Sequence, residues 1–209
     1  MMFVPFLFAL CFHEFAHGLV AKLKGDNTAE LAGRLSLNPL VHADLIGTWI
    51  LPISAILLGS PFFFGWAKPV PVNSRNLKHP RQDMFWIALA GPASNIFLAL
   101  VSTVVLGVVY AYAQSGGIGG ALELLLMTFI QVNLFLAIFN LIPVHPLDGG
   151  KVIAPFLPIR WNIWLEQNQS ALSMGLLVVL LLMGQVLAIP VDWAAQKLLS
   201  VSGAIAHLI

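Results

Sequence analysis

The chain begins with an apolar stretch that contains a charged motif, MMFVPFLFALCFHEFAHGLVAKLKG (residues 1–25). A helix of about 20 apolar residues is long enough to cross the hydrocarbon core of a bilayer. Two histidines and a glutamate inside such a helix are costly to bury in lipid, and ionisable groups in this setting usually serve a function. The stretch therefore predicts a membrane helix over residues 1–23, with a functional site inside it.

The composition of the whole chain extends this prediction. Of the 209 residues, 59% are apolar and only 9% are charged, whereas an average soluble domain carries about 25% charged residues. So little polar surface excludes a water-soluble enzyme and a disordered chain, and a net charge of +1 offers no basic surface for nucleic acid. We therefore expect an all-α polytopic membrane protein in which residues 1–209 form a single domain embedded in the lipid bilayer.

Three further apolar runs complete the expected bundle of about four core transmembrane helices, and they cover residues 84–112, 121–145 and 170–190. The region of residues 31–73 between the first two helices has a different pattern. Its GRLSLNP run alternates as a short strand does. The run therefore predicts a short strand in this region.

The basic residues of the loops predict the orientation. Loops 66–83 and 146–168 carry lysine and arginine, whereas loop 113–120 carries none, so the first two should face the cytoplasm. Lys22 and Lys24 place the end of the first helix on that side too. The apolar segment 45–64 would then begin and end on one side as a re-entrant segment, which its prolines and glycines permit. By hydropathy alone, an ordinary span is the alternative.

The motif HEFAH (residues 13–17) indicates a metal site. On a helix, His13 and His17 lie about 40° apart and about 6 Å along the axis, so both imidazoles can bind one ion. Glu14 lies about 60° from His17, where its carboxylate can serve as a general base. This spacing suits zinc, which in catalytic sites commonly has three protein ligands and one open position.

Asp148 is the best candidate for the third ligand. It lies in NLIPVHPLDGG (residues 140–150), where two prolines should end a helix and two glycines allow a sharp turn. Taken alone, Asp148 would be read as an ordinary turn or cap aspartate. It can meet His13 and His17 only if an even number of membrane crossings separates them, which again requires that segment 45–64 does not cross.

Three motifs, HEFAH, AGPASN (residues 90–95) and NLIPVHPLDGG, together resemble the site-2 protease family of intramembrane zinc metalloproteases. The stretches GRLSLNP and GWAKPVPVN look like its short bacterial and archaeal members. The resemblance implies one Zn²⁺ per chain, held by His13, His17 and Asp148, with Glu14 as the catalytic base. It also implies that residues 31–73 form a membrane-dipping hairpin with short β-strands and that Asn140 contacts the substrate backbone. The protein would then reside in a bacterial or archaeal cell membrane.

Two other polar residues have alternative interpretations. His145 precedes Asp148 by three residues, where relatives in the family often have proline, and it is either an alternate ligand or supporting group or an interfacial histidine that faces the loop. Asn95 lies inside an apolar run. It makes either an ordinary hydrogen bond between helices or one that supports the site.

These features predict hydrolysis of a peptide bond in or near the transmembrane segment of a membrane-protein substrate, with the active site toward the cytoplasmic side. By the resemblance, the substrates are single-span membrane proteins, and no nucleic-acid partner is expected. The alternative is a membrane metal-ion transporter or sensor that uses the same His/Asp cluster. Against it, the polar residues gather near one side of the membrane, and transport would leave Glu14 without a role.

Overall fold

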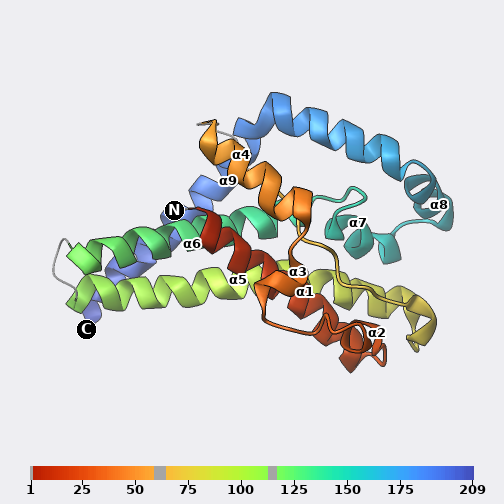
Figure 1. Cartoon of the computed structure of the whole chain (residues 1–209), viewed down its shortest axis with the longest axis horizontal. Helices are drawn as coiled ribbons and strands as arrows, with labels where there is room; N and C mark the ends of the chain where they lie inside the picture. The colour runs from red at the N-terminus through yellow and green to blue at the C-terminus, as the bar shows by residue number, and fades with distance from the viewer. Residues whose placement is uncertain (1, 59–64, 113–116) are drawn as a thin grey trace.

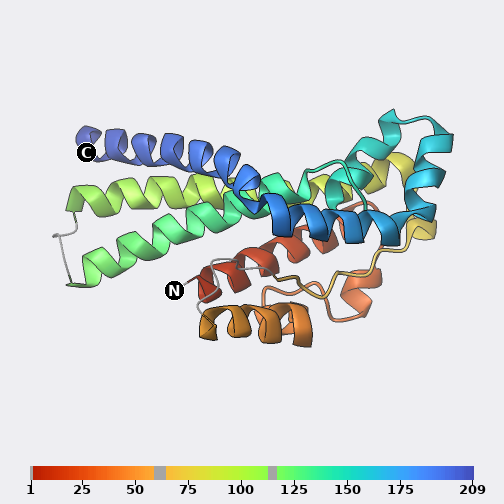
Figure 2. The same ribbon diagram turned by 90° about the horizontal axis from the view of Figure 1, so that it is seen from above.

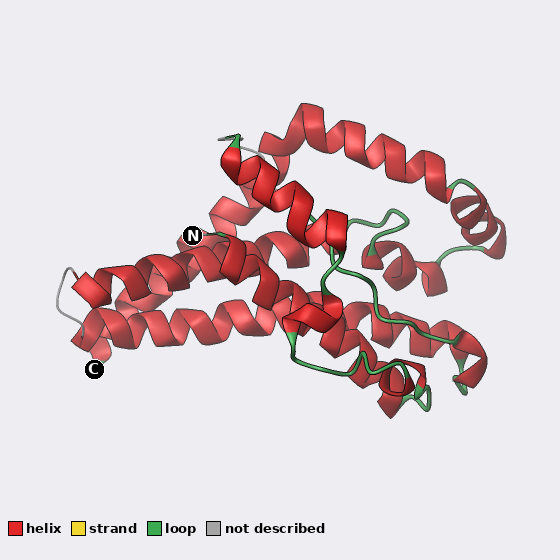
Figure 3. Ribbon diagram, in the orientation of Figure 1, coloured by secondary structure: helices red, strands yellow, loops and turns green. Residues whose placement is uncertain are grey.

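The computed structural model describes residues 2–58, 65–112 and 117–209, with side chains except at 177, 180–185 and 187. Within these ranges every regular element is a helix (Figure 3). Helices α1 (Phe3–Leu23), α5 (Pro80–Tyr112) and α6 (Gly117–Asn140) are long and apolar enough to cross a membrane. The last helix, α9 (Gln169–Leu208), has 40 residues. The prediction of an all-α membrane protein is confirmed.

Helix α5 is central to the bundle and packs against α1, α6, α7 and α9 (Figures 1 and 2). A buried cluster joins α5 to α6 and to the second half of α9, through Ala99, Leu106, Ile130, Leu134, Val191 and Ala195. A second cluster joins α1 to α6, through Phe6, Ala9, Leu10, Val132 and Leu136. The polar side chains of the bundle lie inside it, since Asn95 and Asn133 are both 0% exposed. The protein thus hides its amides between helices and leaves apolar side chains on the outside, as a bilayer requires.

Several helix ends differ from the predicted ones, among them the start of α6, which lies at Gly117 and not at residue 121. Helix α5 begins at Pro80, before residue 84, because proline fits the first helical turn and the Asp83 carboxylate accepts a hydrogen bond from the His79 N–H (2.9 Å). Helix α6 ends at Asn140, before residue 145, because Pro143 and Pro146 cannot continue it. Helix α9 runs through Pro190 and changes direction along its length (Figure 2), as a proline inside a helix allows.

The predicted β-strands of the hairpin are wrong for the described part of residues 31–73. This region follows α2 (Thr28–Leu31) and forms the short helices α3 (Pro39–His42), η1 (Leu45–Ile50) and α4 (Leu51–Leu57). Asn38 caps α3 by accepting from the Leu40 N–H (3.1 Å), and Asp44 caps η1 by accepting from the N–H groups of Ile46 and Gly47. These caps favour helical turns where the alternation alone suggested a strand. A further turn, η2 (Ser74–Asn76), follows the region.

Residues 65–73 are extended but do not form a ladder. Pro69 and Pro71 have no N–H, so a continuous set of strand hydrogen bonds is impossible there. The N–H groups of Trp66 and Lys68 instead donate to the carbonyl oxygens of Gly47 (3.1 Å) and His42 (2.8 Å). The two ends of segment 45–64 therefore lie side by side; its residues 59–64 are outside the described ranges.

Candidate metal centre

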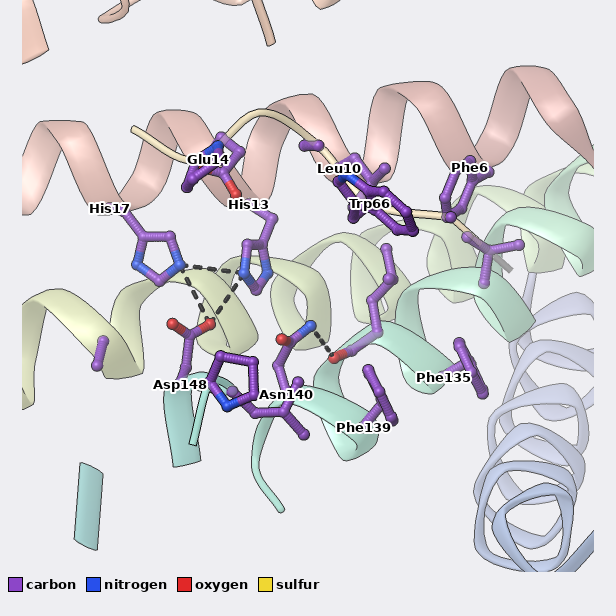
Figure 4. A pocket seen from close by; sticks show the side chains of 18 of the residues that line it. Phe6, Leu10, His13, Glu14, His17, Trp66, Phe135, Phe139, Asn140 and Asp148 are labelled. Carbon is purple, nitrogen blue, oxygen red and sulfur yellow. Dashed lines mark hydrogen bonds and ion pairs between the residues drawn. The ribbon is translucent and has the colours of Figure 1, made fainter. Parts of the chain in front are cut away.

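Three predicted residues from distant parts of the chain meet in one cluster (Figure 4). His13 and His17 lie one turn apart on α1, and Asp148 is the first residue of α7 (Asp148–Ile153). Asp148 Oδ2 lies 3.0 Å from His13 Nε2 and 3.2 Å from His17 Nε2, and the two Nε2 atoms are 3.0 Å apart. All three side chains are buried. The cluster is compact enough for a single metal ion.

The triangle of donor atoms fits zinc. Tetrahedral coordination with bonds of about 2.0–2.1 Å places ligand atoms roughly 3.3 Å apart. The three observed separations, between 3.0 and 3.2 Å, are close to this value. Two imidazole nitrogens and one carboxylate oxygen are also ligand types that zinc accepts, and three of them leave a fourth position for a water or a substrate.

Hydrogen bonds to the far side of each ring set the histidine tautomers. His17 Nδ1 donates to the carbonyl oxygen of Ile87 (2.6 Å), and His13 Nδ1 donates to Asn95 Oδ1 (2.7 Å). In the neutral rings, both Nε2 atoms then carry lone pairs that point at each other and at the Asp148 carboxylate. Three lone-pair donors converge with no proton between them, and a bound cation resolves this repulsion.

The chain around Asp148 is shaped to bring its carboxylate to α1. A Cβ atom on Gly149 would lie 2.4 Å from the carbonyl oxygen of Leu141, so only glycine permits the tight return of the chain after α6. Arg81 of α5 then holds the segment beyond α7, because its Nη2 donates to the carbonyl oxygens of Pro155 (2.7 Å) and Leu157 (3.0 Å). The position of Asp148 is thus fixed by the close contact of Gly149 with the end of α6 and by the hydrogen bonds from Arg81 of α5.

Glu14 lies next to the cluster but outside the set of metal-binding atoms. Its side chain points toward the extended segment 65–73 (Figure 4), where Oε2 accepts a hydrogen bond from the Val70 N–H (2.7 Å). The residue is half-buried and lines the same cavity as the three ligands. This position suits a carboxylate that exchanges protons beside a metal without binding it.

The three supporting residues proposed from the sequence have different surroundings. Asn140, at the end of α6, lines the cavity, and its Nδ2 donates to the carbonyl oxygen of Leu136 (3.0 Å; Figure 4). Asn95 bonds His13 directly, which favours the supporting interpretation over a simple bond between helices. His145 is outside the described donor triangle and packs against Gly150. Burial, and then the nearby Lys151 ammonium, lower the pKa of His145.

The cluster opens into a cavity of about 1100 Å³. One wall comes from α1 and α6 and is apolar, formed by Phe6, Leu10, Val132, Phe135, Leu136 and Phe139. Residues 65–72 form another side, and the first half of α9 contributes Ser173, Leu176 and Ala188. An apolar space with a few polar groups at one end suits an apolar peptide segment better than a small polar solute.

Sequence reasoning missed two residues of the site. A Cβ atom at Gly91 would lie 2.4 Å from His17 Nε2, so this glycine lets α5 approach the ring. Asn133 Oδ1 accepts a hydrogen bond from Asn95 Nδ2 (2.9 Å), and Asn95 in turn bonds His13. The AGPASN motif was the available signal for Gly91. An asparagine inside an apolar helix, costly in lipid, was the signal for Asn133.

Comparison with known proteins places the chain among peptidases. The family model described as Peptidase family M50 matches residues 108–184. YwhC of Bacillus subtilis is 36% identical over 169 residues, which cover 80% of this chain and 74% of YwhC. Rip2 of Mycolicibacterium smegmatis is 32% identical over 151 residues, or 72% of this chain and 55% of Rip2. Both relatives carry the name zinc metalloprotease.

A further zinc metalloprotease, from Methanocaldococcus jannaschii, is 30% identical over 109 residues, which cover 51% of this chain and 30% of that protein. No solved structure gives a significant match. Neither the family match nor the names of the relatives favours a metal-ion transporter or sensor. The similarity to YwhC and the family match agree with the geometry of the cluster, and the chain belongs to peptidase family M50, the zinc metalloproteases of the site-2 protease type.

Proposed function

We propose that this chain hydrolyses a peptide bond in or near the transmembrane segment of a membrane-protein substrate, with His13, His17 and Asp148 as the zinc ligands and Glu14 as the base. The observation that carries the proposal is the meeting of three lone-pair donors, two from α1 and one from α7, within 3.0–3.2 Å of one another. They face a cavity of about 1100 Å³ whose lining is mostly apolar.

The chain's own residues perform the proton transfers. When bound, zinc supplies a Lewis acid that polarises the scissile carbonyl and makes the attacking water more acidic. The Glu14 carboxylate takes the proton of that water as its oxygen bonds to the carbonyl carbon. Glu14 then delivers the proton to the amide nitrogen, so that the C–N bond breaks and the amine leaves neutral.

The substrate segment must unwind before cleavage, because the hydrogen bonds of an intact helix shield its carbonyl groups. We propose that the extended segment 66–73 binds the unwound chain by an interrupted β-addition, since Pro69 and Pro71 offer no N–H at their positions. The Val70 N–H already contacts Glu14, so a substrate beside this segment would lie next to the base. The Asn140 amide lines the same cavity and is placed to contact the substrate backbone. A single-span membrane protein is the substrate class that such a lateral, apolar site would accept.

We also propose that the metal centre lies toward the cytoplasmic side of a bacterial or archaeal cell membrane. The loops at the metal-site end carry the lysine and arginine residues that favour this side. The relatives come from bacteria and from one archaeon, in agreement with such a membrane.

The proposal is tested with Glu14→Gln and Asp148→Ala in the purified full chain. Glu14→Gln should keep the zinc content of the parent and cleave a helical substrate about 100-fold or more slowly, because the amide cannot accept a proton. Asp148→Ala should lose both zinc and cleavage, because one of three ligands is missing. Zinc is measured by elemental analysis and cleavage by gel assay.

Glu30→Gln is the matched control, since Glu30 is exposed, forms an ion pair with Lys22 (2.6 Å) and does not line the cavity of the ligands. It should behave as the parent does. Cleavage by Glu14→Gln at the parent rate would refute the base assignment, and undiminished zinc in Asp148→Ala would refute the third ligand.

A further inference from the structure

A chain of buried amides leads away from the metal cluster into the centre of the bundle. His13 Nδ1 bonds Asn95 Oδ1 (2.7 Å), and Asn95 Nδ2 donates to the Ala9 carbonyl (3.2 Å) and to Asn133 Oδ1 (2.9 Å). Asn133 Nδ2 in turn donates to the Phe129 carbonyl (2.8 Å). Asn95 and Asn133 are both 0% exposed. This chain of hydrogen-bonded amides connects α1, α5 and α6 through four hydrogen bonds.

The direction of every bond in this chain follows from its ends. A backbone carbonyl only accepts, so the Phe129 oxygen requires the amino group of Asn133 on its side and leaves Oδ1 toward Asn95. The Asn95 amino group must then face Asn133 and Ala9, and its Oδ1 must face His13. An oxygen acceptor at that point requires a hydrogen on His13 Nδ1, which leaves the Nε2 lone pair for the metal.

We propose that Asn133 is a positioning residue for the metal centre: through Asn95 it holds His13 in the tautomer and ring orientation that bind zinc. This inference rests on the proposed zinc site. Asn133 does not touch the metal-binding atoms, so it acts only through Asn95. When Asn133 is replaced, Asn95 loses one of its two hydrogen-bond acceptors but keeps the bond to the Ala9 carbonyl oxygen. The orientation of the Asn95 amide is then held less firmly, but it is not lost.

The chain offers a matched control on the same helix. Thr128 of α6 is buried, and its hydroxyl donates to the carbonyl four residues earlier, that of Leu124 (2.7 Å), as Asn133 Nδ2 does to Phe129. Thr128→Val therefore removes a buried hydrogen bond of the same kind without touching the amide chain. A purely structural role of Asn133 would make the two variants alike in every measurement.

The experiment compares the parent, Asn133→Leu, Asn133→Asp and Thr128→Val as full-length proteins in detergent. Zinc affinity is measured by competition with a chelator of known affinity, and the thermal stability of the zinc-free proteins is measured in parallel. We expect Asn133→Leu to bind zinc about 10-fold more weakly, at the lower end for loss of a group behind a ligand. Asn133→Asp should remain within about threefold of the parent, because a buried, neutral aspartic acid can both accept and donate.

Thr128→Val should keep the zinc affinity of the parent even if its melting temperature falls. In ¹⁵N NMR of the zinc-free protein, His13 should show the Nδ1–H form in the parent and a mixture of both tautomers in Asn133→Leu. Asn133→Ala serves the same comparison if the leucine variant does not fold.

The outcomes separate the two proposals. If the parent binds no zinc, the proposed function fails. If the parent binds zinc and Asn133→Leu binds it as tightly as Thr128→Val does, the amide chain is structural only and this inference is overturned. An equal loss of affinity in Asn133→Leu and Asn133→Asp would overturn it as well.

Discussion

The absence of a single methyl group at Gly91 lets α5 approach the metal-binding rings. A Cβ atom at this position would lie 2.4 Å from His17 Nε2 and 2.6 Å from His13 Cε1. Neither ring can move away freely, because hydrogen bonds from Nδ1 hold the rings to the Ile87 carbonyl and to Asn95. The glycine therefore serves the metal site directly, beyond its role in helix packing.

Gly91→Ala should lower zinc affinity by at least about 10-fold, because the new methyl group displaces both imidazoles, and such overpacking costs about 1–3 kcal/mol. Chelator competition on the purified protein measures the effect. Gly120→Ala on α6 is the control, since nothing lies within 4 Å of its added methyl group. Equal zinc affinity in the two variants would show that the rings adapt without loss.

At the scale of elements, the extended segment beside Glu14 is anchored at both ends. Arg34 Nη2 donates to the carbonyl oxygen of Lys68. At the other end of the segment, the Asn73 N–H donates to the carboxylate of Asp26 (2.7 Å), a buried residue just after α1. Asp26 also accepts hydrogen bonds from Asn76 Nδ2 (2.7 Å) and from Thr28. Glu14, the proposed base, thus contacts a segment that is held by a charged side chain just beyond the end of its own helix.

Asp26 makes the attachment of this segment pH-dependent. Burial acts to raise its pKa, but the hydrogen bonds from Thr28, Asn76 and Asn73 outweigh burial, and the pKa of Asp26 is lowered. A carboxyl group with a depressed folded-state pKa stabilises the fold above its unfolded pKa of about 3.9. That stability is lost as the pH falls through the folded-state pKa.

Asp26→Asn should therefore destabilise the protein at pH 7 by about 1–3 kcal/mol, because the amide presents an N–H where N–H donors already point. Thermal unfolding in detergent, followed from pH 7 to pH 3, measures this. The gap to the parent should begin to narrow as the pH falls below about 4, because the unfolded parent then takes up a proton at Asp26 that the folded parent binds only at lower pH. In Glu30→Gln, which breaks an exposed ion pair, the change should stay below about 1 kcal/mol at every pH. A gap that stays constant across this range would contradict the assignment.

At the scale of the whole molecule, the two ends of the bundle are unlike. Helices α2, α7 and α8 (Ile159–Gln167) gather at the metal-site end, whereas the end of α5, the start of α6 and the C-terminus lie at the other end (Figure 1). The Trp66 N–H donates to the Gly47 carbonyl oxygen, so residues near the start of segment 45–64 lie beside residues just after it. The parts of the chain before and after this segment therefore lie on the same side of it.

This arrangement predicts which residues share a side of the membrane. Single cysteines at Leu31 and Arg75, in a Cys11→Ala background, should react with a membrane-impermeant maleimide only after the cells are opened. A cysteine at Ile118, which is 90% exposed near the start of α6, should react in intact cells. Leu31 is likewise 86% exposed, so access to the side chain itself is not limiting.

The pair at Leu31 and Arg75 tests segment 45–64, because these residues flank it. Labelling of the two from opposite sides would show that the segment spans the membrane. Labelling of both in intact cells, with Ile118 protected, would instead reverse the proposed orientation and leave the re-entrant segment in place.

Local patterns in the sequence determined the membrane helices and the spacing of His13, Glu14 and His17, because helix geometry repeats every few residues and needs no distant partner. The meeting of Asp148 with the two histidines was also expected, since catalytic zinc sites commonly have three protein ligands, and its role as a ligand stays a prediction. The β-hairpin was wrong for an equally local reason: an alternating run is a weak signal when Asn38 and Asp44 cap helical turns and two prolines remove N–H groups.

Only the tertiary structure decided what surrounds the ligands. The approach of Gly91, the bond from Val70 to Glu14 and the path from His13 through Asn95 to Asn133 each join helices or loops that lie far apart in the chain. No periodicity within one segment records such contacts, because they depend on how α1, α5 and α6 pack together. Helix geometry therefore sets the spacing of His13 and His17 within α1, whereas the packing of the bundle brings Asp148 to them and sets the hydrogen bonds of both rings and their access to the cavity.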